Sequence, residues 1–117
     1  MVFVIAEAGI NHNGDMTVAC KLIDAAAESG ANAVKFQTFD PDKLDPPGPR
    51  RDMLREVVLP TDGYHVLRRR CEAHGLEFMS TPFDLGSLRF LVEVIGVKRI
   101  KIASGQLDNW PLLHAAR

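Results

Sequence analysis

The sequence is poor in cysteine, with two in 117 residues. Cys20 and Cys71 lie within predicted helices and share no metal-like spacing, so we interpret them as reduced thiols in the core of a cytoplasmic protein. Long apolar runs are also absent, since none approaches the roughly 20 residues that a membrane-spanning helix requires. The opening residues, MVFVIAEAGI, have neither a basic leader nor a cleavage site, which argues against a signal peptide. The sequence therefore predicts a soluble protein that does not enter a membrane.

Net charge is nearly absent as well. Fourteen Lys and Arg residues stand against fifteen Asp and Glu residues, which gives a formal charge of −1. This balance provides no electrostatic reason to expect nucleic acid or an anionic membrane as a partner. The 46% hydrophobic and 25% charged residues are typical of a globular protein. At 117 residues the chain forms at most one domain, since domains cluster around roughly 100–150 residues.

A short pattern occurs three times along the chain. A helical segment ends at a glycine, and a run of β-branched and aromatic residues follows, in ESGANAVKFQT, AHGLEFMSTP and VIGVKRIKIAS. Gly30, Gly75 and Gly96 fit the left-handed residue that closes a helix, and the residues after them suit buried strands. Strands of this kind that alternate with helices predict parallel βαβ units.

The order of elements predicts four such strands. The expected elements are the strand VFVIAEA, a helix over 16–29 with Asp15 as N-cap, a loop over 40–51 that its prolines and glycine keep irregular, a short helical piece over 52–58, helices over 61–74 (N-cap Thr61) and 85–95, and a helix that begins after Asn109. A closed eight-stranded α/β barrel needs about 250 residues. The fold class is therefore α/β, either the first four βα units of a (β/α)8 TIM barrel or a small open parallel sheet. In both, function belongs at the carboxyl ends of the strands.

Lysine and hydroxyl side chains recur at these strand ends. Lys35 and Lys101 each lie five residues after their unit's glycine, and Thr81 and Ser104 lie nearby in the later units. Two ammonium groups and two hydroxyls would together bind an anion. The alternative is that each lysine reaches solvent or pairs with a neighbouring carboxylate.

A carboxylate and a histidine follow the first strand. Glu7 ends this strand, and its carboxylate could serve as a general base, orient a substrate hydroxyl, or bond to amides of the loop. We interpret His12, in NHNGD, as a turn residue rather than a metal ligand. The helical histidines at 65, 74 and 114 have no metal-binding spacing. No metal site is expected within this chain.

Four motifs carry a family resemblance. FVIAEAGINHNGD, AVKFQTF, FMSTPFD and IKIASGQLDNWPLL resemble, in order, segments of the sialic acid synthases, which make N-acetylneuraminate, legionaminate or pseudaminate. The resemblance covers residues 3–117 and implies a (β/α)8 barrel followed by a small antifreeze-like domain. It implies condensation of phosphoenolpyruvate with an N-acetylmannosamine-type sugar and release of phosphate, with a divalent metal such as Mn²⁺ or Mg²⁺.

The resemblance also assigns roles to residues. It implies that Glu7 is the catalytic carboxylate, that Gln37 lies near the sugar and the enolpyruvate, and that phosphoenolpyruvate is held by Lys35, Thr81, Lys101 and Ser104. The family's metal-binding histidines belong to later strands, so the metal's ligands are not expected in this chain.

Residues 1–117 would then be the N-terminal half of the barrel, from the first strand to the start of the fourth helix, and inactive alone. We expect a cytoplasmic homo-oligomer whose partners are phosphoenolpyruvate and an N-acetylated amino sugar. One alternative is a non-catalytic half-barrel that self-assembles, or pairs with a partner that supplies the missing strands. Another is a relative of the octulosonate and heptulosonate phosphate synthases, against which NHNGD and STPFD argue.

Overall fold

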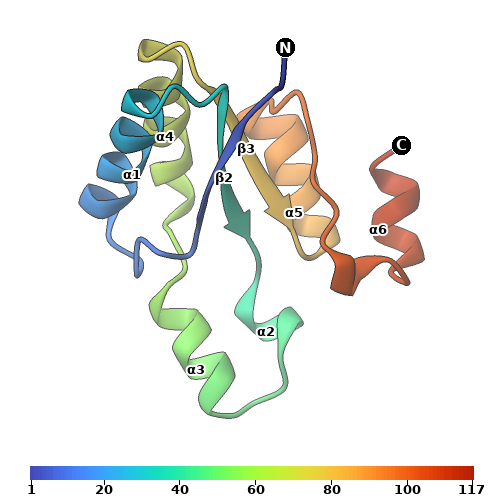
Figure 1. The fold of residues 1–117 in the computed structure, drawn as a ribbon. Helices are drawn as coiled ribbons and strands as arrows, with labels where there is room; N and C mark the ends of the chain where they lie inside the picture. The colour runs from blue at the N-terminus through green and yellow to red at the C-terminus, as the bar shows by residue number, and fades with distance from the viewer.

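A three-stranded parallel sheet organises the chain in the computed structural model, which describes residues 1–117. The strand order is β1 (Ile5–Gly9), β2 (Ala33–Thr38), β3 (Glu77–Pro82). Helices α1 (Met16–Glu28) and α4 (Thr61–Ala73) connect the strands and pack against each other (Figure 1). This is an α/β fold, as the sequence predicts.

The remaining elements are short. They are α2 (Pro41–Leu44), α3 (Pro49–Glu56), α5 (Leu85–Arg89), the π-helical η1 (Phe90–Ile95), the 3₁₀ helix η2 (Ser104–Gln106) and α6 (Trp110–Ala115). Helices α2 and α3 lie beyond the carboxyl end of β2, and α6 lies beside α5 (Figure 1). None of the helices combines the length and the apolar character needed to cross a bilayer.

The main core lies between one face of the sheet and the helices. Val34 and Phe36 on β2 are 1% and 0% exposed and belong to one apolar cluster with residues of α1, α4 and η1. Because side chains alternate along a strand, Lys35 and Gln37 project to the opposite face, where both are half-buried. The sheet therefore separates an apolar, helix-covered face from a polar one.

The glycine-capped helices and two of the N-caps are confirmed. Gly30, Gly75 and Gly96 have φ angles of 79°, 70° and 75°, in the left-handed region that glycine enters without strain. The Asp15 carboxylate accepts hydrogen bonds from two backbone N–H groups of α1, and the Asn109 side chain caps α6. These residues fix where the chain leaves each helix and enters the next segment.

The predicted N-cap Thr61 is wrong. Pro60 holds that position in the extended conformation, and no side chain caps α4. The loop predicted over 40–51 is also wrong in part, because α2 and α3 begin at Pro41 and Pro49. Proline is compatible with the first turn of a helix, where its missing N–H has no partner to lose. The helix predicted over 85–95 is found as α5 and η1.

The fourth predicted strand is not formed. Its segment makes one isolated parallel bridge, between Ser80 of β3 and Ile100. The segment lies at the edge of the sheet, where β3 is its sole neighbour, and its charged residues Lys98, Arg99 and Lys101 are exposed. One-sided pairing with few buried side chains provides little to hold an extended ladder.

Candidate functional site

Three predicted site residues meet on the polar face of the sheet. Glu7 on β1 is the register partner of Lys35 on β2, and the Lys35 ammonium forms an ion pair with the Glu7 carboxylate. The same ammonium donates a hydrogen bond to Oγ1 of Thr81 on β3, at 3.4 Å. The Lys35 side chain is 16% exposed and that of Glu7 is 49% exposed. A largely buried ammonium is thus neutralised by a carboxylate that itself reaches solvent.

Gln37 lies next to this group. It is the register partner of Thr81, two residues on from Lys35 along β2. A Cβ at Gly9 would lie 3.2 Å from Oε1 of Glu7 and 3.7 Å from Nε2 of Gln37. The bare backbone of Gly9, at φ 55°, therefore leaves room for both side chains. Sequence reasoning did not single out Gly9, although a glycine directly after a strand was the available signal.

Lys101 and Ser104 are not joined to this cluster. The Lys101 ammonium donates to the carbonyl of its neighbour Ile102 at 2.8 Å, and both Lys101 and Ser104 are exposed. Their segment touches β3 through one bridge, so the strand ladder does not fix where these side chains point. Their assignment as anion-binding residues stays a prediction.

Asp84 links the loops that follow β2 and β3. Its carboxylate accepts hydrogen bonds from the backbone N–H of Asp40 at 3.0 Å and from the N–H and hydroxyl of Ser87, each at 2.8 Å. It therefore caps α5 and ties together the loops that follow β2 and β3. Sequence reasoning missed Asp84. The available signal was an Asp directly before a predicted helix, with a Ser three positions later.

His12 is buried in the loop between β1 and α1. The residue is 1% exposed, and its ring stacks on Phe36 with centroids 6.0 Å apart. Nδ1 accepts a hydrogen bond from the N–H of Gly14 at 2.9 Å, whereas Nε2 has no partner. Burial lowers the pKa of the imidazole, because a charged ring would lose hydration. His12 thus shapes the turn, as predicted, in its neutral form.

A divalent metal does not fit the residues of this chain. No group of three or more His, Cys, Asp or Glu side chains lies close enough to share one ion. The other histidines are exposed, and His74 bonds to Asp24 at 2.8 Å on the outer surface of the helices. A metal would require ligands from outside residues 1–117.

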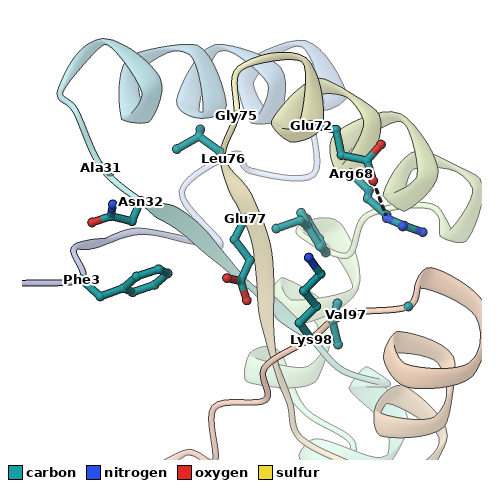
Figure 2. A pocket seen from close by; sticks show the side chains of 12 residues that line it. Phe3, Ala31, Asn32, Arg68, Glu72, Gly75, Leu76, Glu77, Val97 and Lys98 are labelled. Carbon is teal, nitrogen blue, oxygen red and sulfur yellow. Dashed lines mark ion pairs between the residues drawn. The ribbon is translucent and has the colours of Figure 1, made fainter.

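A pocket of about 540 Å³ lies at the other end of the sheet (Figure 2). It is lined at the amino ends of the strands by residues that include Phe3, Asn32 and Glu77. Glu77 lies 3.6 Å from Arg99, whose guanidinium stacks on Phe3. Parallel α/β proteins bind ligands at the carboxyl ends of their strands, so this pocket is not the candidate site.

Comparison with known proteins identifies the family. Residues 22–117 match the NeuB family. The chain belongs to the NeuB family. Among similar proteins is N,N'-diacetyllegionaminic acid synthase of Legionella pneumophila, 43% identical over 127 residues that cover 96% of this chain and 35% of that protein. Another is N-acetylneuraminate-9-phosphate synthase of Homo sapiens, 33% identical over 126 residues that cover 96% of the chain and 35% of the human protein.

A solved NeuB-type structure has the same fold. The N-acetylneuraminic acid (sialic acid) synthetase of Leptospira borgpetersenii, solved in complex with citrate, superposes with a TM-score of 0.93 at 38% identity. The superposition covers 98% of this chain and 40% of that one. The chain therefore spans a little over a third of the length of the NeuB relatives that it matches.

Proposed function

We propose that this chain is the amino-terminal part of a (β/α)8 synthase that condenses phosphoenolpyruvate with an N-acetylmannosamine-type sugar to give a sialic acid-like nonulosonate. Membership of the NeuB family supports the reaction class. The observation that carries the site is the contact of Lys35 with Glu7 and Thr81 across three adjacent strands. These side chains lie on the polar face, where Glu7 and Lys35 are in the middle of β1 and β2 and Thr81 is next to the last residue of β3. Barrels of this type bind their substrates at the carboxyl ends of their strands.

Lys35 and Thr81 bind the anionic part of phosphoenolpyruvate in this proposal. The Lys35 ammonium supplies a charge that water screens little, because the side chain is 16% exposed. The Thr81 hydroxyl, on a residue that is 3% exposed, supplies a directed hydrogen bond. Lys101 and Ser104, from the segment beside β3, extend the anion site, and Gln37 contacts the sugar and the enolpyruvate.

Glu7 is the catalytic carboxylate. The reaction forms a carbon–carbon bond between the methylene carbon of phosphoenolpyruvate and the aldehyde carbon of the sugar. Water adds at the enolpyruvate carbon that carries the phosphate, and this phosphate leaves as inorganic phosphate. Glu7 reaches solvent beside Lys35 and is suited to orient a reacting hydroxyl or to take its proton. A divalent metal, Mn²⁺ or Mg²⁺, belongs to the complete enzyme with ligands outside residues 1–117.

The test measures the release of phosphate by the protein in the form in which its source organism produces it. The protein is incubated with phosphoenolpyruvate, Mn²⁺ or Mg²⁺, and a panel of N-acetylated mannosamine-type sugars. Release that depends on the sugar, with a nonulosonate detected by mass spectrometry, is the expected result. Phosphate release without sugar, or none with any sugar, would argue against the proposed synthase.

A second candidate is a non-catalytic half-barrel that self-assembles or pairs with a partner that carries further strands. The exposed apolar residues before and within β1 favour it, since Val2, Val4 and Ile5 are 82%, 50% and 40% exposed. Sedimentation of the native protein separates the two. A homogeneous assembly of 12.9 kDa chains without synthase activity would support the second candidate, whereas a longer, active chain that forms homo-oligomers would support the first.

A further inference from the structure

Three buried hydroxyls form a chain on the apolar face of the sheet, behind the candidate site. Oγ of Ser80 lies 2.7 Å from Oγ1 of Thr38, and Thr38 donates to the Tyr64 hydroxyl at 3.0 Å. The Tyr64 hydroxyl donates in turn to the backbone carbonyl of Gln37 at 3.3 Å. The exposed fractions of Ser80, Thr38 and Tyr64 are 0%, 7% and 4%. We call these three residues the hydroxyl chain.

The donors of the hydroxyl chain run in one direction. Since Thr38 donates to Tyr64, its lone pair accepts the proton of Ser80, and each O–H donates once. Burial raises the pKa of Tyr64, so its phenol stays protonated and able to donate. This series of hydrogen bonds ends at the backbone carbonyl of Gln37, a proposed site residue. The hydroxyl chain thus connects helix α4 and strand β3 to the backbone of β2.

Aromatic rings pack against one side of the hydroxyl chain. The Tyr64 ring makes edge contacts with Phe78 and Phe90, with centroids 6.2 Å and 5.3 Å apart. Hydroxyls buried among such rings cost free energy unless each is hydrogen bonded, and apolar side chains of the same shape would fill the same space. A complete buried network fixes geometry more than it adds stability. We therefore infer that the three hydroxyls serve to fix the relative position of the strands rather than to stabilise the fold.

The strand positions that the hydroxyl chain fixes are those of the site. Thr38 follows Gln37 on β2, and Ser80 precedes Thr81 on β3. Gln37 and Thr81 are register partners, and their side chains project to the polar face. The Lys35–Thr81 contact, at 3.4 Å, is close to the limit for a hydrogen bond, so a small shift between β2 and β3 would break it.

We propose that Tyr64, acting through Thr38 and Ser80, is a positioning residue that holds Gln37 and Thr81 in register for the substrates of the synthase. The inference rests on the proposed function for its catalytic consequence. Tyr64 touches no reacting atom, and its effect passes through the backbones of β2 and β3. Loss of the hydroxyl chain lets Gln37 and Thr81 shift while the protein stays folded. A displacement of about 1 Å in an active site can cost about 100-fold in rate, so the reaction slows.

The test compares variants that remove one hydroxyl with variants that keep all three, each made in the protein as its source organism makes it. Tyr64→Phe and Thr38→Val remove a hydroxyl and keep the shape, whereas Thr38→Ser keeps the hydroxyl and removes a methyl group. Phe90→Leu disturbs the ring that packs on Tyr64 and leaves every hydroxyl in place. We expect a fall in kcat of about tenfold for Tyr64→Phe and Thr38→Val, and near wild-type kcat for Thr38→Ser and Phe90→Leu.

Amide hydrogen exchange provides a readout that does not depend on catalysis. Exchange at residues 37–38 and 80–81 is expected to accelerate in Tyr64→Phe and Thr38→Val by more than the change in global unfolding free energy accounts for, and Thr38→Ser restores protection. Wild-type kcat, KM and exchange in Thr38→Val would overturn the proposal, as would an equal loss in Phe90→Leu. If the wild-type protein has no synthase activity, the proposed function fails, and exchange alone decides whether the hydroxyl chain holds the strands. If Tyr64→Phe does not fold, the comparison of Thr38→Val with Thr38→Ser decides whether the hydroxyl is required.

Discussion

Glu7 and Lys35 face each other across β1 and β2 and form an ion pair on the polar side of the sheet. The pair brings together the proposed catalytic carboxylate and the proposed anion-binding ammonium, from residues 28 positions apart in the sequence. Their contact has opposite consequences for the two roles. The carboxylate reduces the positive potential that an anionic substrate meets, and the ammonium holds the carboxylate in place on the polar face of the sheet.

Replacement of Glu7 by glutamine separates these two effects. Glu7→Gln keeps the shape of the side chain and removes its charge, so the Lys35 ammonium attracts an anion more strongly. We expect kcat to fall at least about 100-fold, since general acid–base groups contribute roughly 10²–10⁴, while KM for phosphoenolpyruvate does not rise. Steady-state kinetics of the intact protein measure both. A rise in KM with unchanged kcat would assign Glu7 to binding instead.

Replacement of Gly9 by alanine tests the crowding beside Glu7. The new Cβ would lie 3.2 Å from Oε1 of Glu7, and the backbone φ of 55° is costly for alanine. Gly30→Ala is the matched control, because its φ is 79° and nothing lies within 4 Å of the added Cβ. We expect both variants to lose about 1–2 kcal/mol of unfolding free energy and Gly9→Ala alone to lose activity. Equal activity in the two variants would remove the link between Gly9 and the site.

The buried His12 makes stability depend on pH. Its pKa in the folded protein lies below the ordinary value of 6.5, because burial disfavours the charged ring. The unfolded chain therefore binds a proton more readily as the pH falls below about 6.5, and the free energy of unfolding decreases through that window and is unaffected above it. Urea unfolding from pH 8 to pH 5 should show this decrease in the wild type and a smaller one in His12→Gln. Parallel pH profiles of the two proteins would contradict the burial of a neutral ring.

An ion cluster on the outer surface joins α1 to α4. Asp24 accepts hydrogen bonds from Arg70 at 2.8 Å and 2.6 Å, and it lies 2.8 Å from His74. The bonds from Arg70, then that with His74, lower the pKa of Asp24 from 3.8 to about 2. The stabilisation is present above pH 3.8 and is lost as the pH falls toward 2, where the carboxylate takes up a proton.

Asp24→Asn should therefore lower the Tm at neutral pH, and its difference from the wild type should shrink between pH 4 and pH 2. Asp52→Asn is the control, because its carboxylate is 71% exposed and lies 4.0 Å from Arg55. Thermal unfolding followed by circular dichroism gives the comparison. A difference that persists at pH 2 would show that the carboxylate charge is not the cause.

Much of the fold follows from local signals. Glycine caps at 30, 75 and 96, the N-cap Asp15 and the apolar runs predict where the first three strands and their helices lie. Strands that start from equivalent turns also predict that Lys35 and Thr81 are neighbours, and the structure joins them with Glu7. These features depend on residues close together in sequence or on the alternation of side chains along a strand.

The features that were missed depend on distant partners. The segment after Gly96 has a strand-like sequence, but an extended ladder needs neighbours that β3 alone does not supply. Helices α2 and α3 begin at Pro41 and Pro49, whereas treating proline only as a helix breaker predicts a loop there. The hydroxyl chain joins residues 26 and 42 positions apart, and the sole local signal was a hydroxyl at the apolar-facing positions 38 and 80.

Binding of phosphoenolpyruvate to Lys35 is the most direct test of the proposed site. Isothermal titration of the intact protein compares the wild type with Lys35→Met and with Lys21→Met, an exposed lysine of α1 given the same substitution. We predict a loss of affinity of at least about tenfold for Lys35→Met, since hydrogen bonds to charged groups are worth about 1.5–3 kcal/mol, and unchanged affinity for Lys21→Met. Equal affinity in the three proteins would mean that phosphoenolpyruvate does not bind at the Lys35 ammonium.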